Sequence, residues 1–172
     1  MSGEPSGAAA AVLELITARA LWLIRQDAAP LAIAAAARAL AAGLDGEALR
    51  ELAGVPRTIG TFELGDLIEA SLTSLGVPAS LMTEEDSLVL GANHYARQVI
   101  GGRLATREFT AWAHSVIGHG GPEIAQEIVE LDDHLDGLEV GWGESPDPLH
   151  VIEGFLDVSN SVVQKWLRFW NR

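Results

Sequence analysis

Residues 61–78 read TFELGDLIEASLTSLGVP, and this stretch indicates the fold class more clearly than any other part of the chain. Thr61 is a suitable N-cap residue, and Gly76 with Pro78 forms a typical helix stop. The apolar residues between these ends recur three or four positions apart and therefore share one face of a helix. They are Leu64, Leu67, Ile68, Leu72 and Leu75. The pattern predicts a helix that buries this face against neighbouring helices.

Similar start and stop signals lie on both sides of this helix. Pro30, Thr83, Thr106 and Pro122 are suited to the first turn of a helix or to the position before it, and glycines close most of the segments that follow them. Further helices are predicted over residues 9–26, 30–43, 45–54, 83–100, 106–117 and 122–136, and over a C-terminal segment that begins at Leu149 or Ser159 and ends at Trp170.

An acidic loop is predicted between the last two helices. Glycines, prolines and carboxylates from Gly137 to Pro148 favour irregular structure. Within this segment Leu138, Val140 and Trp142 alternate with other residues, as they do in a strand. We therefore expect a loop that contains a short extended piece.

The composition favours an all-α fold. Of the 172 residues, 48% are hydrophobic and only 6% aromatic, and runs of β-branched residues are few. The absence of cysteine excludes disulfides and thiolate chemistry. We predict a single-domain helical bundle of about six to eight helices. Its parts are a flexible start at residues 1–8, a near-neutral half at 9–80 and an acidic half at 81–172.

Negative charge is concentrated in one segment. Between Arg107 and Lys165 the chain has no lysine or arginine, and its formal net charge is −13. Almost all of this charge comes from the twelve carboxylates of the segment. They are Glu108, Glu123, Glu127, Glu130, Asp132, Asp133, Asp136, Glu139, Glu144, Asp147, Glu153 and Asp157. Charge of one sign gathered in this way attracts cationic partners and repels nucleic acids and anionic membranes.

Two kinds of partner are disfavoured by the sequence. A pI of about 4.6 lacks the basic excess that nucleic-acid binding needs. The apolar stretch from Ala8 to Ile24 is broken by Glu14 and Arg19, and no positively charged segment precedes it. We therefore expect no nucleic-acid partner, no membrane partner and a cytoplasmic location.

The predicted acidic helix has an apolar stripe beside an acidic one. Both stripes follow the helical spacing, which predicts a buried seam and an exposed row of charges next to it. The seam contains Ile124, Ile128, Leu131 and Leu135, and the row contains Glu123, Glu127, Glu130 and His134. The candidate residues for binding a basic partner are Glu123, Glu127, Glu130, Asp132, Asp133, Asp136 and, as an aromatic anchor, Trp142. The alternative is an acidic surface that serves only solubility.

Five histidines among carboxylates suggest an alternative, a metal-binding bundle or a metal-dependent enzyme. The candidate ligands are His114, His119, Glu130 and His134. On a helix His114 and His119 lie roughly 140° apart, so they share an ion only if the break at Gly118 reorients His119. The paired Glu-x-x-His motifs of di-iron bundles are missing, and we expect no cofactor.

No pattern in the sequence predicts catalytic residues. His114 and Ser115 are neighbours in the chain and point about 100° apart on a helix, so they do not form a nucleophile–base pair. Glu127 and Glu130 are typical of a solvated helix face. A non-enzymatic function is therefore favoured.

Three aromatic residues lie at the end of the last predicted helix. Trp166, Phe169 and Trp170 are flanked by Lys165 and Arg168. The simplest interpretation is a helix that closes the core. The alternative is a contact between copies of the chain, which would make the protein a structural or scaffold subunit.

Residues 99–109 read VIGGRLATREF and predict a helix end, a short turn and a new helix that opens with Glu108 and Phe109. This segment resembles the helical hairpin of small acidic bacterial immunity proteins of the colicin D immunity type. Those proteins are helical and acidic, and they occlude the cationic active site of a nuclease. The resemblance implies an immunity protein or antitoxin. The leading hypothesis is a non-enzymatic, acidic module that binds a basic protein.

Overall fold

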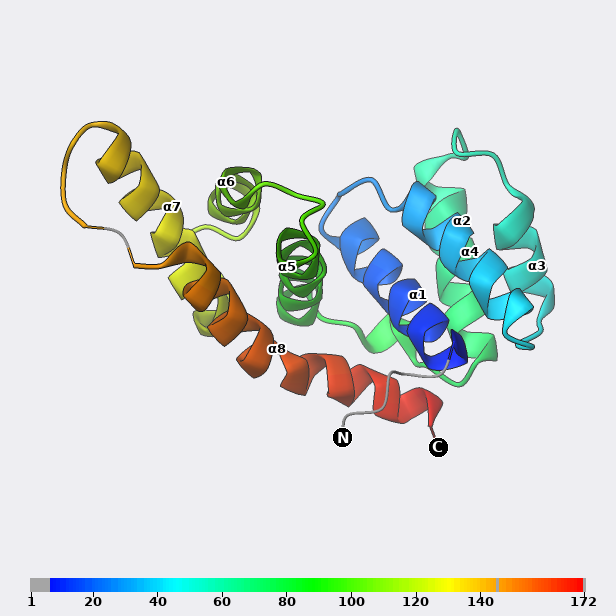
Figure 1. The fold of residues 1–172 in the computed structure, drawn as a ribbon. Helices are drawn as coiled ribbons and strands as arrows, with labels where there is room; N and C mark the ends of the chain where they lie inside the picture. Colours follow the sequence, from blue (N-terminus) through cyan, green and yellow to red (C-terminus); the bar gives the residue numbers. More distant parts are fainter. Residues whose placement is uncertain (1–6, 145, 172) are drawn as a thin grey trace. The chain divides into compact units, whose positions relative to one another are not determined.

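The computed structural model describes residues 7–144 and 146–171, and these residues form an all-α fold (Figure 1). They contain eight α-helices, two 3₁₀ turns and no strand. The helices are α1 (Gly7–Leu23), α2 (Ala29–Ala41), α3 (Glu47–Gly54), α4 (Thr61–Ser74), α5 (Glu84–Ile100), α6 (Thr106–Val116), α7 (Gln126–Glu139) and α8 (Pro148–Trp170). The 3₁₀ turns are η1 (Ala79–Leu81) and η2 (Glu123–Ala125). Within the described residues, no helix combines the length and the apolar character that crossing a bilayer requires.

Most predicted helix boundaries lie within a few residues of those observed. α4 begins at Thr61, although Gly60 rather than Thr61 occupies the N-cap position. The predicted stop is present, since Gly76 adopts a left-handed φ of 82° that L-residues rarely reach. The C-terminal segment forms one continuous helix from Pro148, which is the longer of the two predicted forms.

The extended piece predicted after the acidic helix is wrong. Leu138 is helical, because α7 continues through Gly137 to Glu139. Gly141 and Trp142 then turn back, and their backbone N–H groups donate to carbonyls in the last turn of α7. The alternation that suggested a strand therefore falls on a helix end and a tight turn.

The chain divides into two compact units, which are described separately. The first unit comprises Met1–Ser87 with Val163–Arg172, and the second comprises Leu88–Val162. The sequence predicted a division of the chain near residue 80 into a near-neutral half and an acidic half. It did not indicate that the C-terminal segment belongs to the first unit. Of the predicted flexible start, residues 1–6 lie outside the described part of the chain, and residues 7 and 8 are the first of α1.

In the first unit, α1 is surrounded on most of its sides. It contacts α2 and α4, and α3 contacts the same two helices (Figure 1). Residues on several faces of α1 are buried, from Ala11 to Leu21. The buried residues of α2 are all alanines, whose small side chains let the two helix backbones approach closely.

Asp86 joins the start of α5 to the end of α8 within the first unit. Thr83 Oγ1 accepts the backbone N–H of Asp86 at 3.1 Å, so Thr83 caps α5 as predicted. The Asp86 carboxylate accepts hydrogen bonds from Lys165 Nζ at 2.7 Å and from Trp166 Nε1 at 3.1 Å. Trp166 is 1% exposed, and this contact satisfies the one polar group of its buried ring.

The indole of Trp22 in α1 packs directly over Gly65 in α4. Its Nε1 donates to the carbonyl of Thr61 at 2.7 Å, and the Arg19 guanidinium lies 4.8 Å from the ring centroid. A Cβ atom at position 65 would lie 2.4 Å from two carbons of the ring. The approach of α1 to α4 therefore requires glycine at this position.

Gly65→Ala is expected to lower the free energy of unfolding by about 1–3 kcal/mol, because the fixed indole cannot move away from the added methyl group. This loss outweighs the gain of about 1 kcal/mol that alanine normally brings to a helix. Gly54→Ala, at the end of α3 where nothing lies within 4 Å of the added atom, is the matched control and should be neutral or stabilising. Urea denaturation measures both variants, and equal stability would contradict the steric argument.

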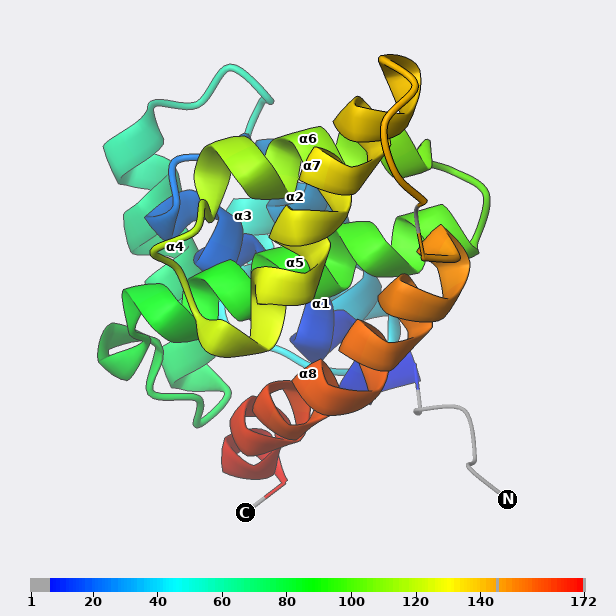
Figure 2. The same ribbon diagram turned by 90° about the vertical axis from the view of Figure 1, so that its left-hand side faces the viewer.

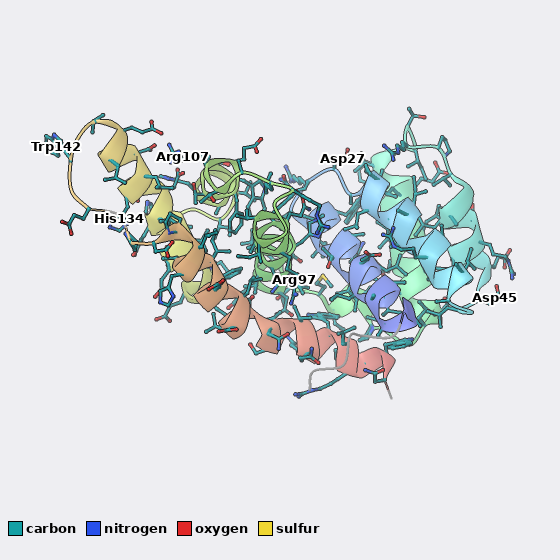
Figure 3. All side chains as sticks on the ribbon, in the orientation of Figure 1. Asp27, Asp45, Arg97, Arg107, His134 and Trp142 are labelled. Atoms are coloured by element: carbon teal, nitrogen blue, oxygen red, sulfur yellow. The ribbon has the colours of Figure 1, made fainter. Side chains whose placement is uncertain are left out.

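In the second unit, a buried polar contact links α5 to α8. Asn93 Nδ2 donates to Ser159 Oγ at 2.7 Å, and Arg97 Nε donates to Asn93 Oδ1 at 2.9 Å (Figure 3 labels Arg97). Apolar side chains from α6, α7 and α8 are also buried in this unit. They include Phe109, Ala113, Ile128, Leu131, Ile152 and Phe155. Two residues of the predicted seam, Ile128 and Leu131, are thus buried as expected.

Burial lowers the pKa of His94 in α5 below its ordinary value of 6.5, and the charge of Arg103 lowers it further. The unfolded chain therefore binds this proton more readily, so the contribution of His94 to stability falls as the pH drops through 6.5 and levels off below the folded-state pKa. In urea denaturation at about pH 7.5 and 5.5, His94→Gln should gain stability relative to the wild type at the lower pH. A difference that is the same at both pH values would contradict this.

Candidate functional site

α6 and α7 lie side by side in the second unit and carry most of the residues that the sequence singled out (Figure 2). The turn between them begins at Gly118, whose left-handed φ of 65° reverses the chain after α6. The side-chain amide of Gln126 donates to the carbonyls of Gly118, Gly121 and Pro122 at 3.1 to 3.4 Å. These bonds fix the turn against the first residue of α7.

Arg107, on the first turn of α6, pairs with three carboxylates of α7. Its Nη1 lies 3.0 Å from Asp132 Oδ1, its Nη2 donates to Asp136, and its Nε lies 3.4 Å from Glu139 Oε1. The hydrogen bond to Asp136 raises the pKa of Arg107 above its ordinary value, and the charges of the three carboxylates add to this. The three acids are spaced four and three residues apart, so one face of α7 is turned toward Arg107.

Asp132 is the most enclosed of the candidate partner-binding residues. It is 6% exposed, and besides Arg107 its carboxylate accepts a hydrogen bond from Thr110 Oγ1 at 2.8 Å and lies 3.1 Å from His114 Nδ1. The structure therefore places Asp132 between α6 and α7 rather than on the surface. The sequence held a signal for this arrangement, since Arg107, Thr110 and His114 recur three and four residues apart on one face of α6.

His114, His119 and Asp133 form a cluster on the same pair of helices. One possible ligand atom from each lies within 4.8 Å of the other two. His119 Nε2 lies 3.2 Å from Asp133 Oδ2, and His114 Nδ1 lies 3.5 Å from Asp133 Oδ1. Of the predicted metal ligands, the structure thus brings His114 and His119 together and adds Asp133.

The other two predicted metal ligands, Glu130 and His134, are exposed on α7 and do not belong to this cluster. Figure 3 labels His134 and Arg107 on α7 and α6, and the helical periodicity places position 134 about 160° from position 132, which faces Arg107. Glu130 and His134 therefore lie on the side of α7 that is turned away from α6.

The remaining acidic candidates form an outer row on η2 and α7. Glu123, Glu127 and Glu130 are exposed, and no hydrogen bond or ion pair joins their side chains to another side chain in the part of the chain that the structure describes. The carboxylates of α7 are therefore divided. Asp132, Asp133 and Asp136 contact basic or imidazole side chains of α6 and its turn, whereas the outer row has no such neighbour.

An apolar tip follows the acidic helix. Val140 is 71% exposed and Trp142 is 78% exposed, and Leu138 on the last turn of α7 is also exposed. Figure 3 shows Trp142 on the outer side of the loop after α7. Single exposed apolar side chains are common, but exposed apolar residues gathered in one place are typical of a binding site. We refer to Leu138, Val140 and Trp142 as the apolar tip.

The aromatic residues near the C-terminus are less available than the tip. Trp166, a candidate for contact between copies, is buried and bonded to Asp86. Phe169 and Trp170 are half-buried. Replacing Trp166 would therefore disturb the core of the first unit whether or not the chain self-associates.

A surface pocket of the first unit was not indicated by the sequence. It has a volume of about 710 Å³ and lies between the end of α1 and the start of α4, with Trp22 and Phe62 among its lining residues. Its charged side chains are Arg25 and Asp27. This lining contains neither a nucleophile with a neighbouring base nor a set of metal ligands, so it does not suggest catalysis.

Comparisons with models of known protein families, with curated proteins and with solved structures find no match for the chain. A function therefore has to be argued from the geometry and chemistry of its own residues.

Asp132→Ala is expected to lower the free energy of unfolding by about 2–3 kcal/mol, because it leaves Thr110 and Arg107 without their buried acceptor. Asp133→Ala is the matched control, since it removes the same group from the next residue, whose side chain is 48% exposed. It should change stability by less than about 1 kcal/mol. Urea denaturation compares the two, and equal effects would contradict the structural role of the buried Asp132 carboxylate between α6 and α7.

Proposed function

We propose that the protein is a non-enzymatic binding module that attaches to a basic protein through the outer row of Glu123, Glu127 and Glu130 together with the apolar tip. The observation that carries this proposal is the division of the acidic helix. Carboxylates that serve the fold are paired with Arg107 or with histidines, whereas the outer row has no cationic neighbour in the described chain. An incoming arginine or lysine would supply that neighbour.

The apolar tip supplies what charge alone does not, namely a residue with enough contact area to hold the partner. Trp142 is exposed between Glu139 and Glu144, so the tip combines an aromatic side chain with a charged border. Energetically important interface residues are enriched in tryptophan and are typically surrounded by polar groups that exclude water. The tip fits this description.

The charge distribution supports a basic partner in particular. A segment without lysine or arginine from Glu108 to Gln164, in a chain of net charge −13, produces a field that accelerates encounters with cationic proteins. Such steering acts mainly on the association rate and weakens as salt is added. We therefore expect the acidic row to control association and the tip to control dissociation.

A more specific form of the proposal is an immunity protein or antitoxin that blocks a basic enzyme. The support is the resemblance of residues 99–109 to the hairpin of colicin D-type immunity proteins, together with the helix–turn–helix that α5 and α6 form there. An inhibitor of this kind needs an acidic surface and no catalytic group. Its partner would carry a cationic active site.

The triple variant Glu123→Lys, Glu127→Lys, Glu130→Lys should slow association by at least about tenfold at low salt, and the difference should shrink as salt is added. The measurement is surface plasmon resonance with the partner that affinity capture on the wild-type chain retains. The control is Glu51→Lys, Glu153→Lys, Asp157→Lys, which makes the same change of charge at exposed positions elsewhere. An association rate as fast in the first variant as in the control would contradict the proposal.

Trp142→Ala should raise the dissociation rate of the same complex by about tenfold or more, equivalent to at least about 1.4 kcal/mol of binding free energy. Phe62→Ala is the matched control, because Phe62 is 84% exposed and aromatic but belongs to the first unit. Dissociation that is unchanged by the loss of Trp142 would rule out the tip as an anchor.

A further inference from the structure

The cluster of His114, His119 and Asp133 has a composition that points to a transition metal. Two imidazole nitrogens and one carboxylate oxygen are ligands that zinc and its neighbours in the periodic table accept, whereas magnesium and calcium prefer oxygen alone. The three side chains come from the last turn of α6, the following turn and α7, so the fold rather than a single helix brings them together.

The spacing of the ligand atoms is suited to a single ion. Around a tetrahedral zinc ion with bonds of about 2.0–2.1 Å, neighbouring ligand atoms lie roughly 3.3 Å apart. His119 Nε2 lies 3.2 Å from Asp133 Oδ2, and one possible ligand atom from each of the three residues lies within 4.8 Å of the other two. The two rings are 5.2 Å apart between centroids and inclined at 74°, so they are not stacked. One ion in this cluster would require only small movements of the side chains.

The surroundings hold two of the ligands in place. Asp132, which is buried and bonded to Arg107 and Thr110, lies 3.1 Å from the Nδ1 atom of His114. In zinc sites a carboxylate commonly accepts a hydrogen bond from the imidazole nitrogen that does not bind the metal, and this fixes the orientation of the ring. Because Asp132 contacts Nδ1 of His114, Nε2 is the nitrogen left to bind the ion. His119 is positioned by the turn that begins at Gly118, and Gln126 braces this turn from α7.

The exposure of the cluster indicates what kind of site it would be. The side chains of His114, His119 and Asp133 are 38%, 57% and 48% exposed. Three protein ligands at the surface leave a fourth position for water or for a group from another molecule. Closed structural zinc sites, in contrast, use four protein ligands.

We propose that His114, His119 and Asp133 bind one Zn²⁺ ion, with Asp132 as the residue that orients His114. The proposal is independent of the partner-binding function, because none of the three ligands belongs to the outer row or the apolar tip. A bound ion would connect the turn after α6 to α7 and would keep an exchangeable position open toward solvent.

The test is isothermal titration calorimetry of Zn²⁺ into the full chain, produced without a histidine tag and treated with a chelator. One ion per chain should bind at micromolar or lower concentration, and Mg²⁺ should not compete. His119→Ala and Asp133→Asn should each weaken binding by about a hundredfold, since the loss of an outer partner alone typically costs about 10- to 100-fold. Both positions are exposed, and circular dichroism verifies that the variants fold.

Two matched controls separate this site from nonspecific binding to an acidic surface. His134→Ala and Glu130→Gln remove one imidazole and one carboxylate from α7 outside the cluster, and both should bind Zn²⁺ as the wild type does. The proposal would be overturned by the absence of one-to-one binding, by wild-type affinity in the His119 or Asp133 variant, or by an equal loss in the controls. None of these results depends on whether a protein partner exists.

Discussion

The ion pairs between Arg107 and α7 are the interaction on which the acidic part of the molecule depends. Asp132, Asp136 and Glu139 share one face of a helix and would repel one another if no cation lay beside them. Arg107 is the last base before a long segment that has none, and it reaches all three. Burial of Asp132 is tolerated because Arg107 and Thr110 donate to its carboxylate.

This pairing gives α7 two sides with different roles. The side toward α6 is paired with Arg107 and contacts the imidazoles of His114 and His119, and it belongs to the fold. The other side carries Glu123, Glu127 and Glu130, which have no cationic neighbour among the described residues, and it continues toward the exposed tip. Solubility alone would be served by either side. The concentration of unpaired charge next to exposed apolar residues is what favours recognition of a basic protein.

The sequence predicted the helices well because their ends carry local signals. Thr83 caps α5 through its own hydroxyl, and Gly76 stops α4 through its left-handed backbone, so both features follow from residues close in the chain. The prediction of a short extended piece was wrong for a related reason. Glycine at position 137 was interpreted as the end of a helix, but glycine only weakens a helix, and α7 continues past it.

The site could be predicted only in part, because its arrangement depends on contacts between helices. Helical periodicity identified the outer row. The packing of α6 on α7 decides which of the other carboxylates face inward, and the sequence does not show this packing. Asp132 was therefore assigned to the surface. His119 approaches His114 because the backbone reverses direction at Gly118. The sequence showed that this reversal was necessary, but it did not show that the reversal occurs. The role of Trp166 was open for the same reason, since its partner Asp86 is distant in the chain.

The most direct test of the proposed recognition surface is amide hydrogen exchange of the chain alone and in complex with its captured partner. We predict slower exchange in the peptides that cover residues 123–144, above all in the loop around Trp142, and unchanged exchange in α2 and α3. Protection confined to the first unit, or no change anywhere in residues 123–144, would contradict the assignment of the outer acidic row and the apolar tip as the binding surface.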